Sequence, residues 1–300
     1  MARKYKAISL SSGAARGFYE LGAVHAAQIN NLLKDVTVFA GSSVGAMIAL
    51  MLAIGWSAMD LFTQLCTDDV NQYIHVGHID IHQAVKTWGL FDSQPLRTYC
   101  SKLIIQKWGG IPTFKELYTT SGVVFICTAY RIKHPDPRTY FSYKTHPDMS
   151  VLDAIMLSSN IPLLFRSAQY EGDFYLDGGT FDLNPAEYVS QYIHLNNLQH
   201  QKDEDAKILS INLDLRDERD TKPIETLTDY IKEIVFLSMY NQKPPQSTST
   251  IDALTISTDL LDTNIPLSID KQTKIKWFVN GLEQGLAFFR QCEQPEQESS

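Results

Sequence analysis

Five residues, Gly41-Ser42-Ser43-Val44-Gly45, constrain the fold of this chain more than any other segment. Residues 46–56, which follow them, are apolar, carry no charge and do not alternate with polar side chains. This pattern predicts a strand, a sharp turn and a buried helix, with the Ser43 hydroxyl exposed at the tip and the helix N-terminus behind it. Ser43 is therefore a candidate nucleophile between Gly41 and Gly45. An ordinary tight turn is the alternative, because a G-x-S-x-G pentapeptide also recurs by chance.

A second turn of small residues lies upstream, in residues 11–17, between a strand pattern over residues 6–10 and a helix pattern over residues 18–33. Small residues allow backbone N–H groups to point at a reacting oxyanion. A phosphate-binding loop or a plain strand–helix turn are the alternatives. The G-x-x-x-x-G-K-[ST] loop is absent, and the turn has two glycines where a dinucleotide loop has three, which disfavours nucleotide binding.

A third segment places a carboxylate before a glycine pair. The apolar residues 174–176 run into Asp177-Gly178-Gly179, a pattern typical of an aspartate held rigidly at the edge of a sheet, although a hairpin turn has the same pattern. Between this segment and the serine turn, residues 158–165 predict a helix end followed by an apolar stretch with a proline. That stretch either lines an acyl pocket or only packs.

In this order and spacing, these segments resemble the motifs of the patatin-like phospholipases, a family of lipid acyl hydrolases. The family's glycine-rich block, G-x-S-x-G turn, Ser-x-x-x-Pro segment and Asp-Gly-Gly block correspond to residues 12–17, 41–45, 158–165 and 177–179. Residues 88–92 and 281–285 also resemble family landmarks. The resemblance implies a single three-layer α/β domain with a central, mainly parallel sheet over residues 5–290, followed by a disordered tail at 291–300.

The resemblance also implies roles for individual residues. Ser43 would be the nucleophile, Asp177 the base in a Ser–Asp dyad, and the N–H groups of Gly13 and Ala14 the oxyanion hole, with the Arg16 guanidinium steadying the loop. This chain departs from the family's Gly-Gly-Gly-x-Arg-Gly block, since Ser12 and Ala14 replace two glycines. A Cβ at position 14 disfavours a left-handed backbone by about 1 kcal/mol, so we expect a hole of different shape.

A catalytic triad is the mechanistic alternative to the dyad. In a chain order of Ser, Asp and His, the base would be His194 or His200, which are the histidines after Asp177. Neither lies beside a glycine or in a turn that suits catalysis, so the dyad is favoured.

The composition agrees with a globular α/β enzyme. The chain has 300 residues, of which 44% are hydrophobic and 20% charged, enough for a large core. Strand patterns at 36–40, 123–129 and 208–213 alternate with helix patterns at 96–106, 226–240 and 271–290, which predicts a layered α/β domain. One domain is favoured over two, because residues on both sides of any midpoint must meet at Ser43. Residues 241–250 are the expected flexible loop.

Charge and cysteine usage exclude several classes. A net charge of −8 without clusters of Lys and Arg excludes a nucleic-acid partner and disfavours electrostatic docking on anionic membranes. The longest apolar run is about a dozen residues, short of the roughly 20 that span a bilayer. The basic N-terminus is followed by no hydrophobic signal region, and the four cysteines form no C-x-x-C pair. We therefore expect a cytoplasmic protein with free thiols and no cofactor.

The histidines His75, His78 and His82 form the one metal-like constellation. Spacings of three and four would align them on a helix, but Gly77 weakens that helix and Asp80 is the only carboxylate among them. Partly exposed histidines are the favoured interpretation, and no metal is expected.

The expected function is lipid acyl hydrolysis through an acyl-Ser43 intermediate. The expected partners are a lipid or phospholipid substrate and a membrane surface contacted transiently, with Trp88, Leu90 and Phe91 as candidate contact residues or, alternatively, core residues. A catalytically weak lipid-binding or scaffold protein that keeps the fold is the alternative function.

Overall fold

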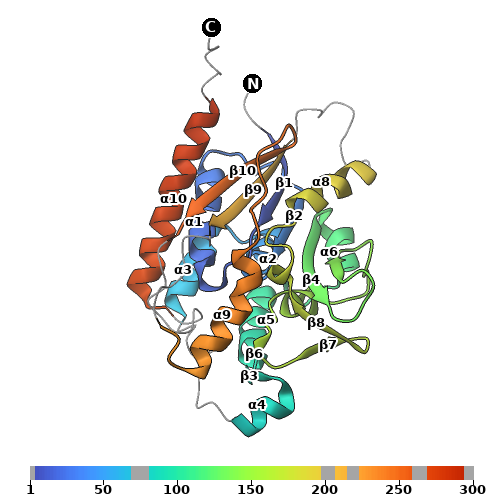
Figure 1. The fold of residues 1–300 in the computed structure, drawn as a ribbon. Coiled ribbons are helices and arrows are strands. Elements are labelled where there is room, and N and C mark those ends of the chain that lie inside the picture. The colour runs from blue at the N-terminus through green and yellow to red at the C-terminus, as the bar shows by residue number, and fades with distance from the viewer. Residues whose placement is uncertain (1–3, 69–80, 197–206, 215–222, 259–268, 294–300) are drawn as a thin grey trace.

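The computed structural model describes residues 4–68, 81–196, 207–214, 223–258 and 269–293 (Figure 1). The first half contains β1 (Tyr5–Leu10), α1 (Gly17–Ile29), β2 (Val38–Ser42), α2 (Val44–Ala53), α3 (Ala58–Thr67), α4 (Ile81–Thr87), β3 (Gly89–Phe91), α5 (Gln94–Trp108), α6 (Phe114–Ser121), β4 (Val124–Arg131) and β5 (Arg138–Phe141). The second half contains α7 (Val151–Ser158), β6 (Leu163–Phe165), β7 (Ala168–Tyr170), β8 (Asp173–Asp177), α8 (Ala186–Leu195), β9 (Lys207–Asp214), α9 (Leu227–Tyr240), β10 (Ile251–Ser257) and α10 (Lys271–Glu293).

The main sheet has the strand order β10-β9-β1-β2-β4-β8-β7, with β5 paired to β4. The pairs from β10 to β4 are parallel, and those of β4 with β5 and β8, and of β7 with β8, are antiparallel. Parallel strands end at the same edge of a sheet, so the turns after β1 and β2 are neighbours at the edge where α/β proteins bind ligands. The expected mainly parallel sheet is confirmed.

Two strands meet end to end along β4. Strand β2 pairs in parallel with residues 124–128 of β4, and β8 pairs antiparallel with residues 129–131, while β5 pairs with residues of both stretches. Because β5 occupies one edge of β4, β2 and β8 must share the other edge. Ser42 lies opposite Thr128, and Asp177 lies opposite Ala129. The carboxyl ends of β2 and β8 therefore face each other.

Hydrophobic side chains fill both sides of the sheet and make three layers. On one face, Ile8 and Leu10 belong to a core that includes residues of α1, α2, α5, α7 and α10. On the other face, Ala7, Val38 and Ile126 pack with residues of α8. Figure 1 shows α10 lying along α1 at one side of the molecule and α8 at the other. The expected three-layer α/β architecture is thus observed.

Several element boundaries differ from the expected ones by a few residues. Helix α1 ends at Ile29, four residues before the expected end, and the chain turns through Asn31 at a φ of 55°. Helix α10 continues to Glu293, three residues beyond the expected boundary at 290, and residues 294–300 lie outside the described residues. Residues 241–250 connect α9 to β10 without helix or strand.

Membrane-spanning potential was tested on the described residues. No single helix there is long and apolar enough to cross a bilayer; α2 and α3 reach that length and composition only as a pair, with a bend of 119° between them.

Candidate active site

The turn between β2 and α2 holds Ser43 in a strained conformation. Ser43 has a φ of 54° and a ψ of −122°, outside the ordinary regions for a residue with a Cβ. The surroundings enforce this turn: a Cβ at Gly45 would lie 2.4 Å from the Ser11 carbonyl oxygen, and one at Gly41 would lie 2.3 Å from the Gly45 carbonyl carbon. The two glycines thus allow the close approach of β1, β2 and α2 that presents the serine.

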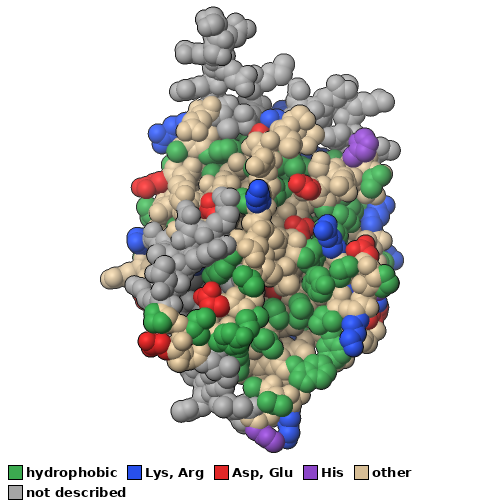
Figure 2. Space-filling view, viewed as in Figure 1, with side chains coloured by type: hydrophobic (Ala, Val, Ile, Leu, Met, Phe, Trp, Pro, Cys, Tyr) green, Lys and Arg blue, Asp and Glu red, His purple; other side chains and the backbone are tan. Residues whose placement is uncertain are grey.

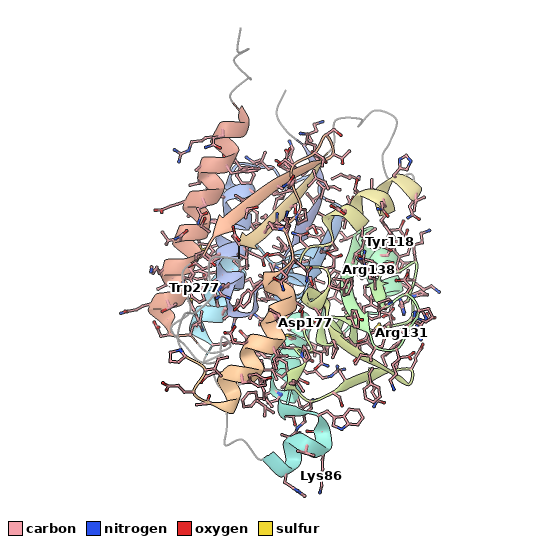
Figure 3. All side chains as sticks on the ribbon, viewed as in Figure 1. Lys86, Tyr118, Arg131, Arg138, Asp177 and Trp277 are labelled. Atoms are coloured by element: carbon pink, nitrogen blue, oxygen red, sulfur yellow. The ribbon has the colours of Figure 1, made fainter. Side chains whose placement is uncertain are left out.

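The side chain of Asp177 receives two hydrogen bonds. Ser43 Oγ donates to Asp177 Oδ2 at 2.5 Å, and the Gly179 N–H donates to Asp177 Oδ1 at 2.8 Å. No side chain stands between the serine and the carboxylate. Gly178 and Gly179 form the short 3₁₀ turn after β8. Asp177 is fully buried, and this burial raises its pKa to about 7, against the lowering effect of the two hydrogen bonds. Figure 3 labels Asp177 near the centre of the molecule.

The small-residue turn after β1 lies at the same cavity as Ser43, because Ala14 and Ser43 both line it. Ala14 has a φ of 51°, the left-handed conformation that its Cβ disfavours. The Arg16 N–H donates to the Gly13 carbonyl oxygen at 3.0 Å, and the Ser12 N–H donates to Leu183 O at 2.7 Å. Within the described part of the chain, no acceptor is assigned to the N–H groups of Gly13 and Ala14. The Arg16 side chain is buried.

Glu20, on α1, anchors the start of this turn. Its Oε1 accepts hydrogen bonds from the Ser11 N–H at 2.7 Å and the Ser11 hydroxyl at 3.1 Å. The Ser11 hydroxyl in turn accepts the Leu213 N–H at 3.0 Å. Glu20 is fully buried, and burial raises its pKa to about 8. These hydrogen bonds join α1, the turn after β1 and β9.

Two further residues hold the serine and aspartate turns, and the sequence pattern indicated neither role. Ser158 Oγ accepts the Ser43 N–H at 3.0 Å, so the end of α7 fixes the serine turn. Gln242 Nε2 donates to the Gly179 carbonyl oxygen at 2.8 Å, and its Oε1 accepts the Leu183 N–H at 3.1 Å. Ser158 begins the segment 158–165, which the sequence analysis singled out for other reasons. Gln242 lies in residues 241–250, and nothing in that pattern distinguishes it from an exposed loop residue.

An apolar cavity of about 160 Å³ opens beside Ser43 and Ala14. Helices α2 and α5 form much of its wall, with Met47, Met51 and Leu103 among the contributors. Ile161 and Phe165 also line it. Both residues belong to the main hydrophobic core as well, so the segment at 158–165 packs in the core and borders the cavity. Lys274, on α10, is the one charged side chain among the described lining residues, and it donates to the Leu65 carbonyl oxygen at 3.0 Å. The cavity can accept a hydrocarbon chain.

The histidine alternatives lie elsewhere or outside the described residues. His194 is exposed in the last turn of α8, and His200, His75 and His78 are outside the described residues. His82 is exposed on α4. No group of three or more potential metal ligands was found among the residues that the structure describes. Cys66, Cys100 and Cys127 are free thiols there.

The sequence was compared with known families and curated proteins. Residues 8–190 match the profile of the family described as patatin-like phospholipase. The chain is 30% identical over 194 residues to "Probable lipid hydrolase 463L" of Invertebrate iridescent virus 6, covering 64% of this chain and 66% of that protein. It is 25% identical over 176 residues to "Uncharacterized protein R571" of Acanthamoeba polyphaga mimivirus, covering 58% of each. The matches thus span less than two thirds of either relative.

Two solved structures share the fold. VipD from Legionella pneumophila superposes with a TM-score of 0.51 at 15% identity, covering 97% of this chain and 67% of that one. The type III effector protein ExoU, from Pseudomonas aeruginosa, gives a TM-score of 0.51 at 16% identity, covering 98% of this chain and 54% of that one. At these identities the likeness concerns the fold alone.

Proposed function

Since this chain belongs to the patatin-like phospholipase family, we propose that it is a lipid acyl hydrolase in which Ser43 attacks an ester carbonyl and Asp177 is the base. The observation that carries the proposal is the direct 2.5 Å hydrogen bond from Ser43 Oγ to Asp177 Oδ2 at the head of an apolar cavity. The name of the iridescent virus relative, a lipid hydrolase, supports the same substrate class.

The reaction runs in two steps. Asp177 takes the Ser43 hydroxyl proton while Oγ bonds to the ester carbonyl carbon, and the Gly13 and Ala14 N–H groups stabilise the oxyanion. The alcohol then leaves with the proton from Asp177, and the acyl group stays on Ser43. Asp177 next takes a proton from water, whose oxygen attacks the acyl carbonyl, and Ser43 leaves reprotonated. An ester and water thus give an acid and an alcohol.

Burial makes Asp177 a better base than a solvated aspartate. An ordinary aspartate has a pKa near 4 and accepts a serine proton poorly. A pKa of about 7 brings the carboxylate close to the optimum for a general base at neutral pH. We therefore favour the dyad over a triad through His194, which is exposed at the end of α8.

The cavity and its neighbourhood support a lipid substrate. Its apolar wall suits the acyl chain, and membrane contact through Trp88, which is 59% exposed, would deliver that chain from a bilayer. Phe91 is buried and belongs to the core instead. Trp88→Ala should therefore reduce activity on vesicles more than on a soluble ester, and equal losses would assign Trp88 to a structural role.

Because the site draws on residues from Ser11 to Gln242, we treat residues 5–290 as one catalytic domain.

The deciding experiment combines a serine-directed fluorophosphonate probe with a mixed lipid panel. The protein should be labelled at Ser43 and should release fatty acid from at least one lipid, and Ser43→Ala should abolish both while keeping the thermal unfolding transition. Labelling at Ser42 would contradict the assignment, and lipid binding without labelling would instead indicate a binding protein.

A further inference from the structure

Helix α9 carries apolar side chains on its exposed face as well as on its buried face, with the half-buried Glu233 beside the exposed ones. Val235 and Met239 are buried against the core, whereas Tyr230, Ile234 and Leu237 are 52%, 47% and 57% exposed. The spacing of four and three residues places the exposed side chains on one stripe of the helix. A surface helix ordinarily presents polar side chains outward, and an exposed apolar group of this kind marks an interaction surface.

Three other exposed apolar side chains belong to elements that Figure 1 shows in the lower half of the molecule, below or beside α9. They are Val85 of α4, Trp88 before β3 and Leu163 of β6. Figure 2 shows hydrophobic side chains gathered over α9 and, in the lower half of the view, around β3, β6 and α4. We call the six side chains the apolar face: Val85, Trp88, Leu163, Tyr230, Ile234 and Leu237.

The apolar face continues to the cavity beside Ser43. Leu163 is 45% exposed, while Ile161 and Phe165, two residues to either side of it, line the cavity. Strand β6 is held there by pairing with β3, through Gly89 opposite Leu163. One short segment therefore separates the outer apolar surface from the wall of the cavity.

Helix α9 is also tied to the catalytic turns. Gln242, two residues beyond the end of α9, donates to the Gly179 carbonyl oxygen and accepts the Leu183 N–H. Leu183 O accepts the Ser12 N–H at 2.7 Å. A surface that holds α9 thus also holds both the aspartate turn and the oxyanion turn in place.

From these contacts we infer that the apolar face docks on the surface of a lipid bilayer, with α9 lying in the interfacial plane. The inference rests on the proposed lipid hydrolysis, which gives a bilayer as the source of the acyl chain that enters beside β6. Tyr230 and Trp88 carry the amphipathic rings that favour the headgroup level. Because the net charge is −8, apolar contact rather than charge drives the docking.

The test is co-sedimentation with phosphatidylcholine vesicles. The wild-type protein should bind them, binding should persist in 0.5 M NaCl within about twofold, and adding anionic lipid should not strengthen it. The double variant Ile234→Asp/Leu237→Asp should lose at least about tenfold in bound fraction, since each carboxylate resists transfer into the apolar interface. Its rate on a soluble ester should stay within about twofold of wild type.

Leu195→Asp is the matched control. Leu195 is 78% exposed at the end of α8, away from the apolar face, so its variant should bind vesicles as wild type does. Equal binding by the double variant, or an equal loss in Leu195→Asp, would overturn the inference. So would a wild-type dimer in light scattering that Ile234→Asp/Leu237→Asp converts to a monomer, because a second copy would then cover the face. Tyr230→Ser replaces the double variant if that protein fails to fold.

The Gln242→Ala variant separates docking from turnover. It should sediment with vesicles as wild type does, while kcat on the soluble ester falls about tenfold with KM nearly unchanged, because the aspartate turn loses its support. Loss of vesicle binding in Gln242→Ala would contradict this division of roles. A wild-type protein that sediments but hydrolyses no ester would refute the proposed function and leave the docking surface standing.

Discussion

Two buried carboxylates in this molecule make nearly the same contacts. Asp177 accepts hydrogen bonds from a serine hydroxyl and a backbone N–H, and so does Glu20. Burial raises the pKa of Asp177 to about 7 and that of Glu20 to about 8. The paired serines differ: Ser43 has a φ of 54° and borders the cavity, whereas Ser11 also accepts the Leu213 N–H and does not line the cavity.

The difference shows that a serine–carboxylate pair is not by itself a catalytic site. What separates the pairs is the backbone strain at Ser43 and its access to a cavity that Ala14 also lines. The Ser11–Glu20 pair instead joins α1, β1 and β9. Variants of the two pairs should therefore have very different effects on catalysis.

The largest contrast is expected between the two carboxylates. Asp177→Asn should lower kcat at least about 10³-fold, because an amide cannot take the serine proton, whereas Glu20→Gln should lower it less than about tenfold. Initial rates on a soluble thioester measure both. His194→Ala and His200→Ala should be near wild type. If either histidine variant loses as much as Asp177→Asn, the base is a histidine and the protein is a triad hydrolase.

The oxyanion turn that Glu20 anchors should give the next largest effect. A Cβ at Gly13 would lie 2.2 Å from Leu213 Cδ1, so the branched side chain of Gly13→Val must displace the Leu213 side chain or the turn itself and should lower kcat by about 10²-fold. Ala14→Gly is the matched control, because glycine accepts a φ of 51° without strain, and its rate should stay within about threefold. Unchanged turnover in Gly13→Val would remove the turn from the mechanism.

The pH dependence of kcat/KM should give a smaller effect, and it tests Asp177. With Asp177 as the proposed base and a pKa of about 7 for its carboxyl, kcat/KM should rise about tenfold from pH 6 to pH 8. The His194→Ala variant should show the same rise. A profile that is flat over this range, or a limb that disappears in His194→Ala, would be incompatible with Asp177 as the titrating group.

The smallest effect concerns stability. Burial raises the pKa of both carboxyls, so each charged carboxylate destabilises the folded protein at high pH. A pKa of about 7 in the folded protein exceeds the ordinary 3.8, so the folded state binds the Asp177 proton more tightly and loses that advantage as pH rises through 7. Asp177→Asn should therefore raise Tm by about 5 °C at pH 9 and leave it unchanged at pH 4. Glu20→Gln should gain less, because Glu20 Oε2 has no partner among the described residues for an amide to bond. Differential scanning calorimetry measures both, and a lower Tm for Asp177→Asn at pH 9 would show that its carboxylate is not penalised.

Much of the fold followed from local patterns. The apolar run after Gly45 predicted α2, and Ile8, Val38 and Ile126 belong to strands whose apolar character was visible in the sequence. The layered arrangement followed from the alternation of such strands with helices. The short strands β3 and β6 did not follow, because three residues carry too little periodicity and depend on each other's pairing.

The site was predictable only where a motif marks it. Ser43 and Asp177 stand in short signatures, and the left-handed backbone considered at Ala14 is observed. Glu20 and Gln242 carry no local signal, and the motif that contains Ser158 did not indicate its bond to the Ser43 N–H, because these roles come from contacts between different elements of the fold. Such contacts depend on the sheet order, which the sequence pattern did not specify.

Strands β2 and β8 meet end to end on β4, but they are synthesised at different times. The serine is therefore made well before the carboxylate. Ser43 leaves the ribosome 134 residues before Asp177, an interval on the order of 10 s at usual elongation rates. Strand β4 emerges in between, so it can receive β2 early, but the carboxylate arrives only with β8. Every nascent or truncated chain that stops before residue 177 therefore carries the proposed nucleophile without the proposed base. With Asp177 as the base, a chain held on a ribosome that stalls in this interval should have no hydrolase activity.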